Sequence, residues 1–386
     1  MKITKLTIWD VDYGTSFNVN QHPAILRIET DQGIHGAGEI GLAYGDGNRG
    51  AIHALAQLAE RHLLGRDARA IGATWDRLYR DTFWGFSPGP LLYGAISAID
   101  NALWDIKGKA LGVPVWQLLG GRMHDSVRLY ANGWFRNMGA PEAAAERALA
   151  IREEGYTACK FDPFEADRDG VFMWPKRHIP REWGLLAVDR VRAVREAVGP
   201  DFDICLDIHG NLGTTDAIIY GRMLAPHRPF FYEEPVDPNN VDSMEKVSRE
   251  VEIPIAGGER LYTRYQFRPF VERQAMDILQ PDIGLCGGIS EMMKIAALGE
   301  VYNLHVQPHN CGGPVASAAA VHAVFAMPNF IILEWFPYWP DGRYDIVQEA
   351  YERKASHGRL PAPTAPGLGI ELNDDYLGRY PRIEVG

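Results

Sequence analysis

The chain has 386 residues, of which 46% are hydrophobic and 23% charged, so it can bury a large core and is not disordered. Its formal net charge of −11 argues against a nucleic-acid partner, which would require a basic stripe on the surface. Four cysteines without C-x-x-C spacing, no apolar run near the ~20 residues of a membrane span, and no signal-peptide core at the N-terminus predict a cytoplasmic protein without a membrane partner.

Residues 1–125 have the pattern of an α+β module. The stretches KITKLTIWDV, HPAILRIETDQG and HGAGEIG read as antiparallel strands joined by tight turns. After them, RGAIHALAQLAERHLLG, ATWDRLYRDTF and GPLLYGAISAIDNALWDIKGKALG carry apolar residues at helical spacing, and the last ends at a Gly-then-Pro stop. Strands followed by helices indicate an α+β unit with its own sheet.

Residues 126–355 alternate between short apolar runs and helical segments. The runs are VRLYAN, YTACKFDP, DFDICLDIHG, FFYEEP, IPIAGGE, MDILQPD, HVQPHN and FIILEW. Eight strands separated by helices are enough to close, so they predict a parallel (β/α)7β barrel, which is a modified TIM barrel, and not an open sheet. The Pro/Gly-rich tail, residues 356–386, is predicted to return to the first module.

One long mixed-charge insertion, FEADRDGVFMWPKRHIPREW (164–183), separates the second barrel strand from its helix. Loops of this length are commonly lids, binding loops or oligomer contacts. Arg177, His178 and Arg181 within the insertion either meet a distal carboxylate or hydroxyl of a ligand or are simply solvated.

Polar residues stand at the ends of nearly all predicted barrel strands, about one strand-plus-helix unit apart. In a barrel these positions point into the mouth of the site. Each one alone is typical of a turn, a helix cap or a solvated loop. Their common phase predicts that they converge. They are Lys160, Asp162, Asp207, His209, Glu233, Glu259, Asp282, His309 and Glu334.

Crowded carboxylates of this kind need a cation, because like charges disfavour joint ionisation. Three carboxylates without Cys or His suit a hard cation with oxygen ligands, which favours Mg²⁺ over Zn²⁺. His309 and Asp282 lie one strand apart and are predicted to form a dyad in which the carboxylate raises the basicity of the imidazole. His209 comes from the other side of the barrel, so two histidines would face each other across a metal-held substrate.

With these residues the sequence resembles the enolase superfamily, in its mandelate racemase-like branch. The resemblance covers essentially the whole chain, from AISAIDNALWDIKGKALGVPVWQLLGG to GLGIELN in the tail. It implies that residues 1–125 cap the barrel together with the tail and that the protein is a homo-oligomer. The metal carboxylates it implies are Asp207 in LDIHGN, Glu233 in YEEP and Glu259 in GGER. It further implies an Asp282–His309 dyad and a Glu334 that donates a hydrogen bond to the substrate carboxylate.

The second strand departs from the racemase pattern, in which Lys-x-Lys supplies a second base. Here CKFDP keeps Lys160 but has Asp162 at the second position, so one base of a two-base racemase is missing. A cycloisomerase-like Lys on strand six is also absent, because Asp282 stands there. The run DIHGN instead resembles acid-sugar dehydratases of the galactonate dehydratase type, in which the histidine, here His209, is the general acid. Spacing two along a strand would keep Asp207 and His209 on one face.

The predicted function is Mg²⁺-dependent dehydration of a sugar acid, an aldonate or an aldarate, to a 2-keto-3-deoxy acid. His309, assisted by Asp282, would remove the proton alpha to the carboxylate, and His209 would protonate the departing 3-hydroxyl. Lys160 either adds positive charge near the substrate carboxylate or pairs only with Asp162. The alternatives are an acid-sugar racemase or epimerase, a sugar-acid cycloisomerase, and a non-catalytic barrel.

Substrate selectivity is implied to come from loops of the capping module and from the segment around Trp84. Candidate substrate-binding residues are Tyr44, Trp84, Asp162 and His178, each of which is equally compatible with an ordinary turn or surface role. The configuration of each substrate hydroxyl is set by loop geometry, which residue identity does not fix.

Overall fold

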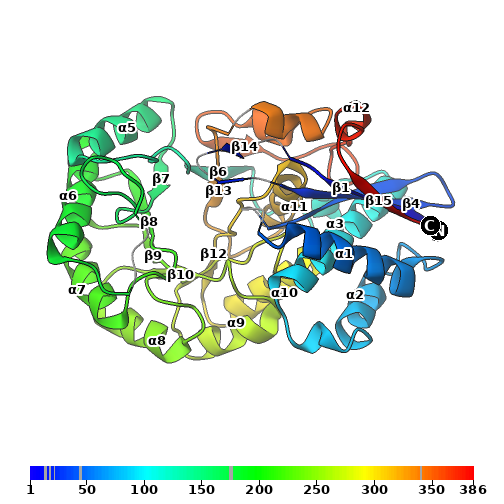
Figure 1. Cartoon of the computed structure of the whole chain (residues 1–386), viewed down its shortest axis with the longest axis horizontal. Helices are drawn as coiled ribbons and strands as arrows, with labels where there is room; N and C mark the ends of the chain where they lie inside the picture. Colours follow the sequence, from blue (N-terminus) through cyan, green and yellow to red (C-terminus); the bar gives the residue numbers. More distant parts are fainter. Residues whose placement is uncertain (13–14, 17–18, 21, 43–45, 174–176, 340) are drawn as a thin grey trace.

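The computed structural model describes residues 1–386 except 13–14, 17–18, 21, 43–45, 174–176 and 340 (Figure 1). Its N-terminal sheet is antiparallel, with the strand order β15-β1-β4-β5. These strands are β1 (Ile3–Asp10), β4 (Ala24–Thr30), β5 (His35–Ile40) and β15 (Arg382–Val385), and β2 (Thr15–Ser16) pairs with β3 (Val19–Asn20). The last strand of the chain therefore completes the first sheet.

Helices of the N-terminal module lie beside this sheet, and the first and third of its α-helices contact the strands. They are α1 (Asn48–Leu58), a π-helical turn at Ala59–Leu63, α2 (Ile71–Arg80), a 3₁₀ turn at Trp84–Phe86, α3 (Pro90–Leu111) and α4 (Val115–Leu118). Two glycines of β5 let α3 approach closely. A Cβ at Gly36 would lie 2.1 Å from Ala102 O, and one at Gly38 would lie 2.0 Å from Ala98 O. The two glycines thus allow the backbones of α3 and β5 to pack directly against each other.

Eight parallel strands form the barrel. They are β6 (Ser126–Ala131), β7 (Ala158–Phe161), β8 (Asp203–Asp207), β9 (Phe231–Glu233), β10 (Ile255–Gly257), β11 (Ile278–Leu279), β12 (His305–Val306) and β13 (Leu333–Trp335). Neighbours in the chain pair in parallel from β6 to β12, and β13 returns to pair with β6. A parallel bridge between Val306 and Phe330 joins β12 to the approach of β13.

Seven helices alternate with these strands. They are α5 (Pro141–Glu153), α6 (Arg181–Val198), α7 (Thr214–Leu224) with a 3₁₀ turn at Ala225–His227, α8 (Val241–Glu250), α9 (Thr263–Glu272), α10 (Gly288–Val301) and α11 (Pro314–Phe325). Figure 1 shows α5 to α9 as an arc around the strands, with the N-terminal module packed beside α10 and α11. The predicted (β/α)7β barrel with an N-terminal α+β module is confirmed.

After the barrel the chain passes through 3₁₀ turns at Asp341–Ile346 and Tyr351–Lys354, β14 (Arg359–Pro361) and α12 (Asp374–Leu377) to β15. β14 pairs antiparallel with β6 of the barrel, whereas β15 pairs antiparallel with β1. The tail therefore contacts both modules before it joins the first sheet. The exact boundaries at 125 and 355 stay predictions.

The insertion between β7 and α6 is held down by Arg190 of α6, whose side chain is 1% exposed. Its guanidinium donates to the carbonyls of Gly139, Pro163, Ala166 and Asp167. The backbone of Arg177 also exchanges hydrogen bonds with Asn211 and Gly213, in the loop after β8. Elsewhere the four cysteines are all buried, and none of the helices in the described ranges has the length and apolarity to cross a membrane.

Candidate active site

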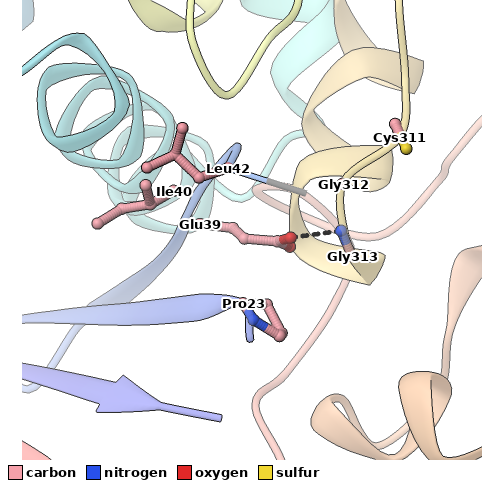
Figure 2. A pocket seen from close by; sticks show the side chains of 7 residues that line it. All are labelled: Pro23, Glu39, Ile40, Leu42, Cys311, Gly312 and Gly313. Atoms are coloured by element: carbon pink, nitrogen blue, oxygen red, sulfur yellow. Dashed lines mark hydrogen bonds between the residues drawn. The ribbon is translucent and has the colours of Figure 1, made fainter. Parts of the chain in front are cut away.

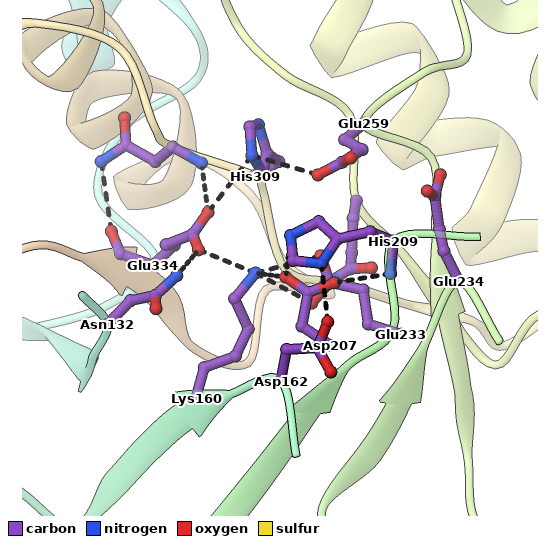
Figure 3. Close-up of polar contacts among 12 residues, drawn as sticks. Asn132, Lys160, Asp162, Asp207, His209, Glu233, Glu234, Glu259, His309 and Glu334 are labelled. Carbon is purple, nitrogen blue, oxygen red and sulfur yellow. Dashed lines mark hydrogen bonds and ion pairs between the residues drawn. The ribbon is translucent and has the colours of Figure 1, made fainter. Parts of the chain in front are cut away.

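The strand-end residues of the barrel converge at one end of it, as Figure 3 shows. Lys160 lies in β7, Asp207 ends β8, Glu233 ends β9, and Glu334 is the middle residue of β13. The remaining members, Glu259, Asp282 and His309, lie in the loops that directly follow β10, β11 and β12. Because parallel strands present their carboxyl ends at the same rim, residues remote in sequence meet here.

Lys160 is the centre of this cluster. Its Nζ lies 2.9 Å from Asp207 Oδ2, 3.0 Å from Glu233 Oε2 and 2.8 Å from Glu334 Oε1, and the residue is 1% exposed. Burial alone would lower the pKa of the ammonium, but the three carboxylates hold that pKa well above its usual value. Lys160 is therefore a fixed cation, and its partners show that it is not paired only with Asp162.

Glu334 is surrounded by hydrogen-bond donors. Its Oε1 accepts from Asn132 Nδ2 at 2.7 Å, and its Oε2 accepts from the Asn310 backbone N–H at 2.8 Å. Burial raises the pKa of Glu334, but Lys160, His309 and the Asn310 N–H together bring the pKa below its usual value. In this arrangement Glu334 is an ionised acceptor, whereas the resemblance had implied a donor to the substrate. Asn132 and Asn310 were not singled out from the sequence.

His309 bridges two loops. Its Nδ1 lies 2.6 Å from Asp282 Oδ2, and its Nε2 lies 3.1 Å from Glu259 Oε2. Burial would lower the pKa of this imidazole, but Glu259, Glu334 and Asp282 raise the pKa well above its usual value. Contacts on both ring nitrogens give His309 a fixed ring orientation.

His209 reaches the cluster from a turn, because β8 ends at Asp207. Its backbone φ of 54° lies in the left-handed region, which is uncommon for a residue other than glycine. Its Nδ1 lies 3.3 Å from Asp162 Oδ2, and its Nε2 lies 3.5 Å from Asp207 Oδ2. The expectation that Asp207 and His209 share one face of a strand is therefore wrong, because His209 lies beyond the end of β8. A strained turn brings the imidazole toward Asp207.

The pair formed by His209 and Asp162 resembles a second dyad. Burial would lower the pKa of His209, but Asp207 and Asp162 raise it to about 10, so the ring carries a proton at neutral pH. Asp162 is 1% exposed and also accepts the Phe164 backbone N–H at 2.7 Å, which fixes the carboxylate. The sequence predicts Asp162 as a substrate-binding candidate, whereas the structure places it against His209.

Further buried acidic groups that the sequence reading missed surround the cluster. Burial, reinforced by Asp162, raises the pKa of Glu165 to about 8. Burial and the charge of Glu259 raise the pKa of Glu234 to about 7, although Arg260 donates to that carboxylate at 2.9 Å. Their only sequence signal is position beside the residues already chosen, in FDPFE and YEEP.

The donor set suits a divalent cation, although the side chains are paired among themselves. Within the described ranges, no three His, Cys, Asp or Glu side chains are arranged as a ligand group. Lys160 engages Asp207 and Glu233, whereas Glu259 contacts His309 and Arg260. Burial and the charge of Asp207 raise the pKa of Glu233 to about 8. This marks an excess of buried negative charge, and hard oxygen donors of this kind fit Mg²⁺.

His178 and Trp84, two other substrate-binding candidates, do not join the cluster. His178 is largely exposed, and its Nδ1 lies 3.0 Å from Asp216 Oδ2 on α7. Trp84 is 67% exposed and packs edge-on against Phe83, with 5.0 Å between ring centroids. Tyr44 lies outside the described residues. Neither His178 nor Trp84 has a contact, within the described part of the chain, that assigns it to the substrate.

Comparison with known proteins gives consistent matches. Residues 12–120 match the model of the mandelate racemase / muconate lactonizing enzyme N-terminal domain, and residues 143–376 match the enolase C-terminal domain-like model. A D-galactonate dehydratase of Cronobacter sakazakii is 34% identical over 98% of this chain and 94% of its own length.

A second relative and a solved structure agree with these matches. A D-gluconate dehydratase of Thermoproteus tenax is 34% identical over 85% of this chain, which spans only 64% of that relative's length. A member of the enolase superfamily from Salmonella Typhimurium superposes with a TM-score of 0.95 at 39% identity, covering 100% of both chains.

Proposed function

Because the chain belongs to the enolase superfamily, in the mandelate racemase / muconate lactonizing enzyme branch, and is like its acid-sugar dehydratases, we propose that it dehydrates a sugar acid to a 2-keto-3-deoxy acid. The substrate would be an aldonate or an aldarate. In the proposed reaction the C2–H and C3–O bonds break, water leaves, and the resulting enol becomes the keto acid.

The observation that carries this proposal is that two histidines, each with its own carboxylate partner, reach one carboxylate cluster from different strands. His309 is paired with Asp282, and His209 with Asp162. Dehydration needs one group that takes the alpha proton and another that delivers a proton to the departing hydroxyl. Two imidazoles that are oriented separately can supply both roles, and neither side chain has to move during the reaction.

We assign His309 as the base, because Asp282 fixes its Nδ1 and leaves Nε2 directed toward the cluster at Glu259. We assign His209 as the acid, because its Nε2 is directed toward Asp207 while Asp162 holds Nδ1. Lys160 supplies positive charge for the substrate carboxylate, and Glu334 orients the Lys160 ammonium through their contact of 2.8 Å.

Asp207, Glu233 and Glu259 would hold Mg²⁺. When bound, this ion supplies positive charge that favours ionisation alpha to a carboxylate. The protein's own part is to hold three oxygen donors on neighbouring strand ends and to keep them largely out of water. The proposal includes the cytoplasmic location and the homo-oligomeric state expected from the sequence, the latter to be checked by light scattering.

The test is a panel of mono- and diacid sugars incubated with the enzyme and Mg²⁺ and assayed for 2-keto-3-deoxy acid. We expect one or a few stereochemically related acids to be converted, with no conversion by the His309→Asn variant. Formation of a C2 epimer without a keto acid would instead indicate an epimerase, with His209 or Lys160 as the second base. Ring opening of a sugar-acid lactone would indicate a cycloisomerase.

A further inference from the structure

Glu39, near the end of β5 in the N-terminal module, extends into the barrel segment that follows His309. One carboxylate oxygen accepts the backbone N–H of Gly313, as Figure 2 shows. The other accepts the backbone N–H of Ala316, at the start of α11, at 3.0 Å. Glu39 is 1% exposed. A Cβ at Gly313 would lie 2.7 Å from Glu39 Oε1, so glycine there leaves room for the carboxylate.

The same strand end also contacts the loop that carries Asp282. The Gly41 N–H donates to Gly284 O at 3.2 Å, and the Gly284 N–H donates to Asp282 Oδ1 at 2.7 Å. A Cβ on Gly41 would lie 2.8 Å from the Gly284 backbone and 3.0 Å from Asp282 Oδ1. Two positions at one strand end, Glu39 and Gly41, therefore contact the segments that follow His309 and Asp282.

We propose that this end of β5 is a positioning element for the His309–Asp282 pair, with Glu39 and Gly41 as positioning residues. The two loops follow the paired strands β11 and β12, and this strand end contacts both of them from outside the barrel. Glu39 sets the start of α11 and hence the segment from Asn310 to Gly313, which follows His309 directly. Gly41 sets how closely the loop that carries Asp282 approaches the end of β5.

A carboxyl group is a demanding choice at this position, because a buried acid is less stable there than an apolar side chain unless it is hydrogen-bonded. Burial raises the pKa of Glu39 to about 7, while the two backbone N–H groups and Arg343 lower it. Arg343 in turn donates to Gly312 O, so the turn after His309 is held from two sides. Glutamine in place of Glu39 would turn an NH₂ group toward one of the two N–H donors and release one contact.

The inference rests on the proposed role of His309, so its test includes a readout that needs no substrate. Glu39→Gln is prepared with isotope-labelled histidine, and the imidazole signals of His309, assigned with His309→Asn, are compared with the wild type. The matched control is Asp105→Asn. Asp105 is also a fully buried carboxylate of the N-terminal module that accepts two backbone N–H groups, from Ala37 and Leu368.

We expect Glu39→Gln to shift the His309 signals and to lower kcat about tenfold or more, with KM within about twofold, because small displacements of a catalytic group reduce rate more than binding. Asp105→Asn should lower the melting temperature while leaving the His309 signals and kcat near wild type. Unchanged His309 signals in a folded Glu39→Gln variant would overturn the inference.

Gly41→Ala keeps the test decisive if Glu39→Gln does not fold. The added methyl must displace the Asp282 loop, so the His309 signals should shift here as well, and their constancy would equally contradict the positioning role. The two proposals fail separately. If no sugar acid is turned over but the His309 signals move, the proposed function fails and the positioning inference stands.

Discussion

Nδ1 of His209 lies 3.3 Å from Oδ2 of Asp162, and the two residues come from adjacent barrel strands. Asp162 occupies the position at which a racemase-like pattern would have a second lysine. The substitution of a base by a carboxylate therefore has a structural counterpart, since the carboxylate holds a histidine that can carry the proton instead. Asp162, which follows the second barrel strand, thus holds His209, which follows the third. This contact favours acid-assisted elimination over two-base racemisation.

Asp162→Asn should separate the two half-reactions. Asparagine can present its NH₂ group to Nδ1 and so favours the wrong ring tautomer or orientation of His209. We expect dehydration to fall about 10- to 100-fold, up to the lower end of the roughly 10²- to 10⁴-fold attributed to general acid catalysis, because His209 itself remains, while exchange of the alpha proton with solvent changes little. The measurement is keto acid formation beside deuterium uptake in the same sample.

Glu165→Gln is the control for this prediction, because Glu165 is a buried carboxyl near the same pair, whereas Asp162 is the carboxylate that holds His209 Nδ1. Its effect on dehydration should be smaller than that of Asp162→Asn. Equal losses of exchange and dehydration in Asp162→Asn would show that Asp162 supports the whole site and not His209 in particular.

Metal removal should abolish turnover and lower stability together. A cation bound only by the folded protein raises the free energy of unfolding by about 2.7 kcal/mol at a hundredfold excess over its Kd. We expect Mg²⁺ to restore both properties after EDTA treatment, and Glu259→Gln to lose most of the Mg²⁺-dependent gain. Thermal or urea unfolding with and without Mg²⁺ measures this gain.

Glu291→Gln controls for the loss of any buried carboxylate. Glu291 is fully buried and pairs with Arg264 at 2.6 Å, outside the cluster. The variant should be less stable than the wild type but should keep the full gain from Mg²⁺. A stability that EDTA and Mg²⁺ leave unchanged in the wild type would count against the metal assignment of Asp207, Glu233 and Glu259.

His322 on α11 predicts a pH dependence of stability. The residue is fully buried, its Nδ1 accepts the Trp116 N–H at 3.2 Å, and burial lowers its pKa from 6.5 to about 4. Between these values the unfolded chain binds the proton and the folded one does not, so stability falls as the pH falls from 6.5 to about 4. His322 contributes about 3 kcal/mol of this loss, by the usual 1.36 kcal/mol for each pKa unit.

Urea unfolding of wild type and His322→Gln from pH 7 to pH 4 isolates this contribution, because the other titrating groups are shared. The difference in unfolding free energy between the two proteins should shrink or reverse toward pH 4. Parallel pH profiles for the two proteins would show that His322 does not titrate across this window.

The barrel and the convergence of the strand-end residues could be predicted from the sequence, because the parallel repeat imposes a regular phase. Asp207, Glu233 and Glu334 follow that phase directly, since each lies in or at the end of its strand. His309, Asp282 and Glu259 lie in the loops just beyond, where the same phase brings them to the rim.

Contacts that depend on loop conformation could not be predicted. His209 reaches the site through a left-handed turn that the alternation of a strand does not anticipate. Glu39 meets Gly313 only because the N-terminal module docks on the barrel, and no local pattern encodes a contact across 274 positions. The sequence could place Lys160 in the site, but it could not identify the three carboxylates that pair with it, which lie on three other strands.

The most direct test of the account is the division of labour between the two histidines. The purified His209→Asn and His309→Asn variants are incubated with Mg²⁺ and the acid sugar that the wild type converts, in deuterated buffer, and followed by NMR. The account predicts that His209→Asn exchanges the alpha proton for deuterium without forming keto acid, and that His309→Asn does neither. Continued alpha-proton exchange by His309→Asn would contradict the assignment of His309 as the base.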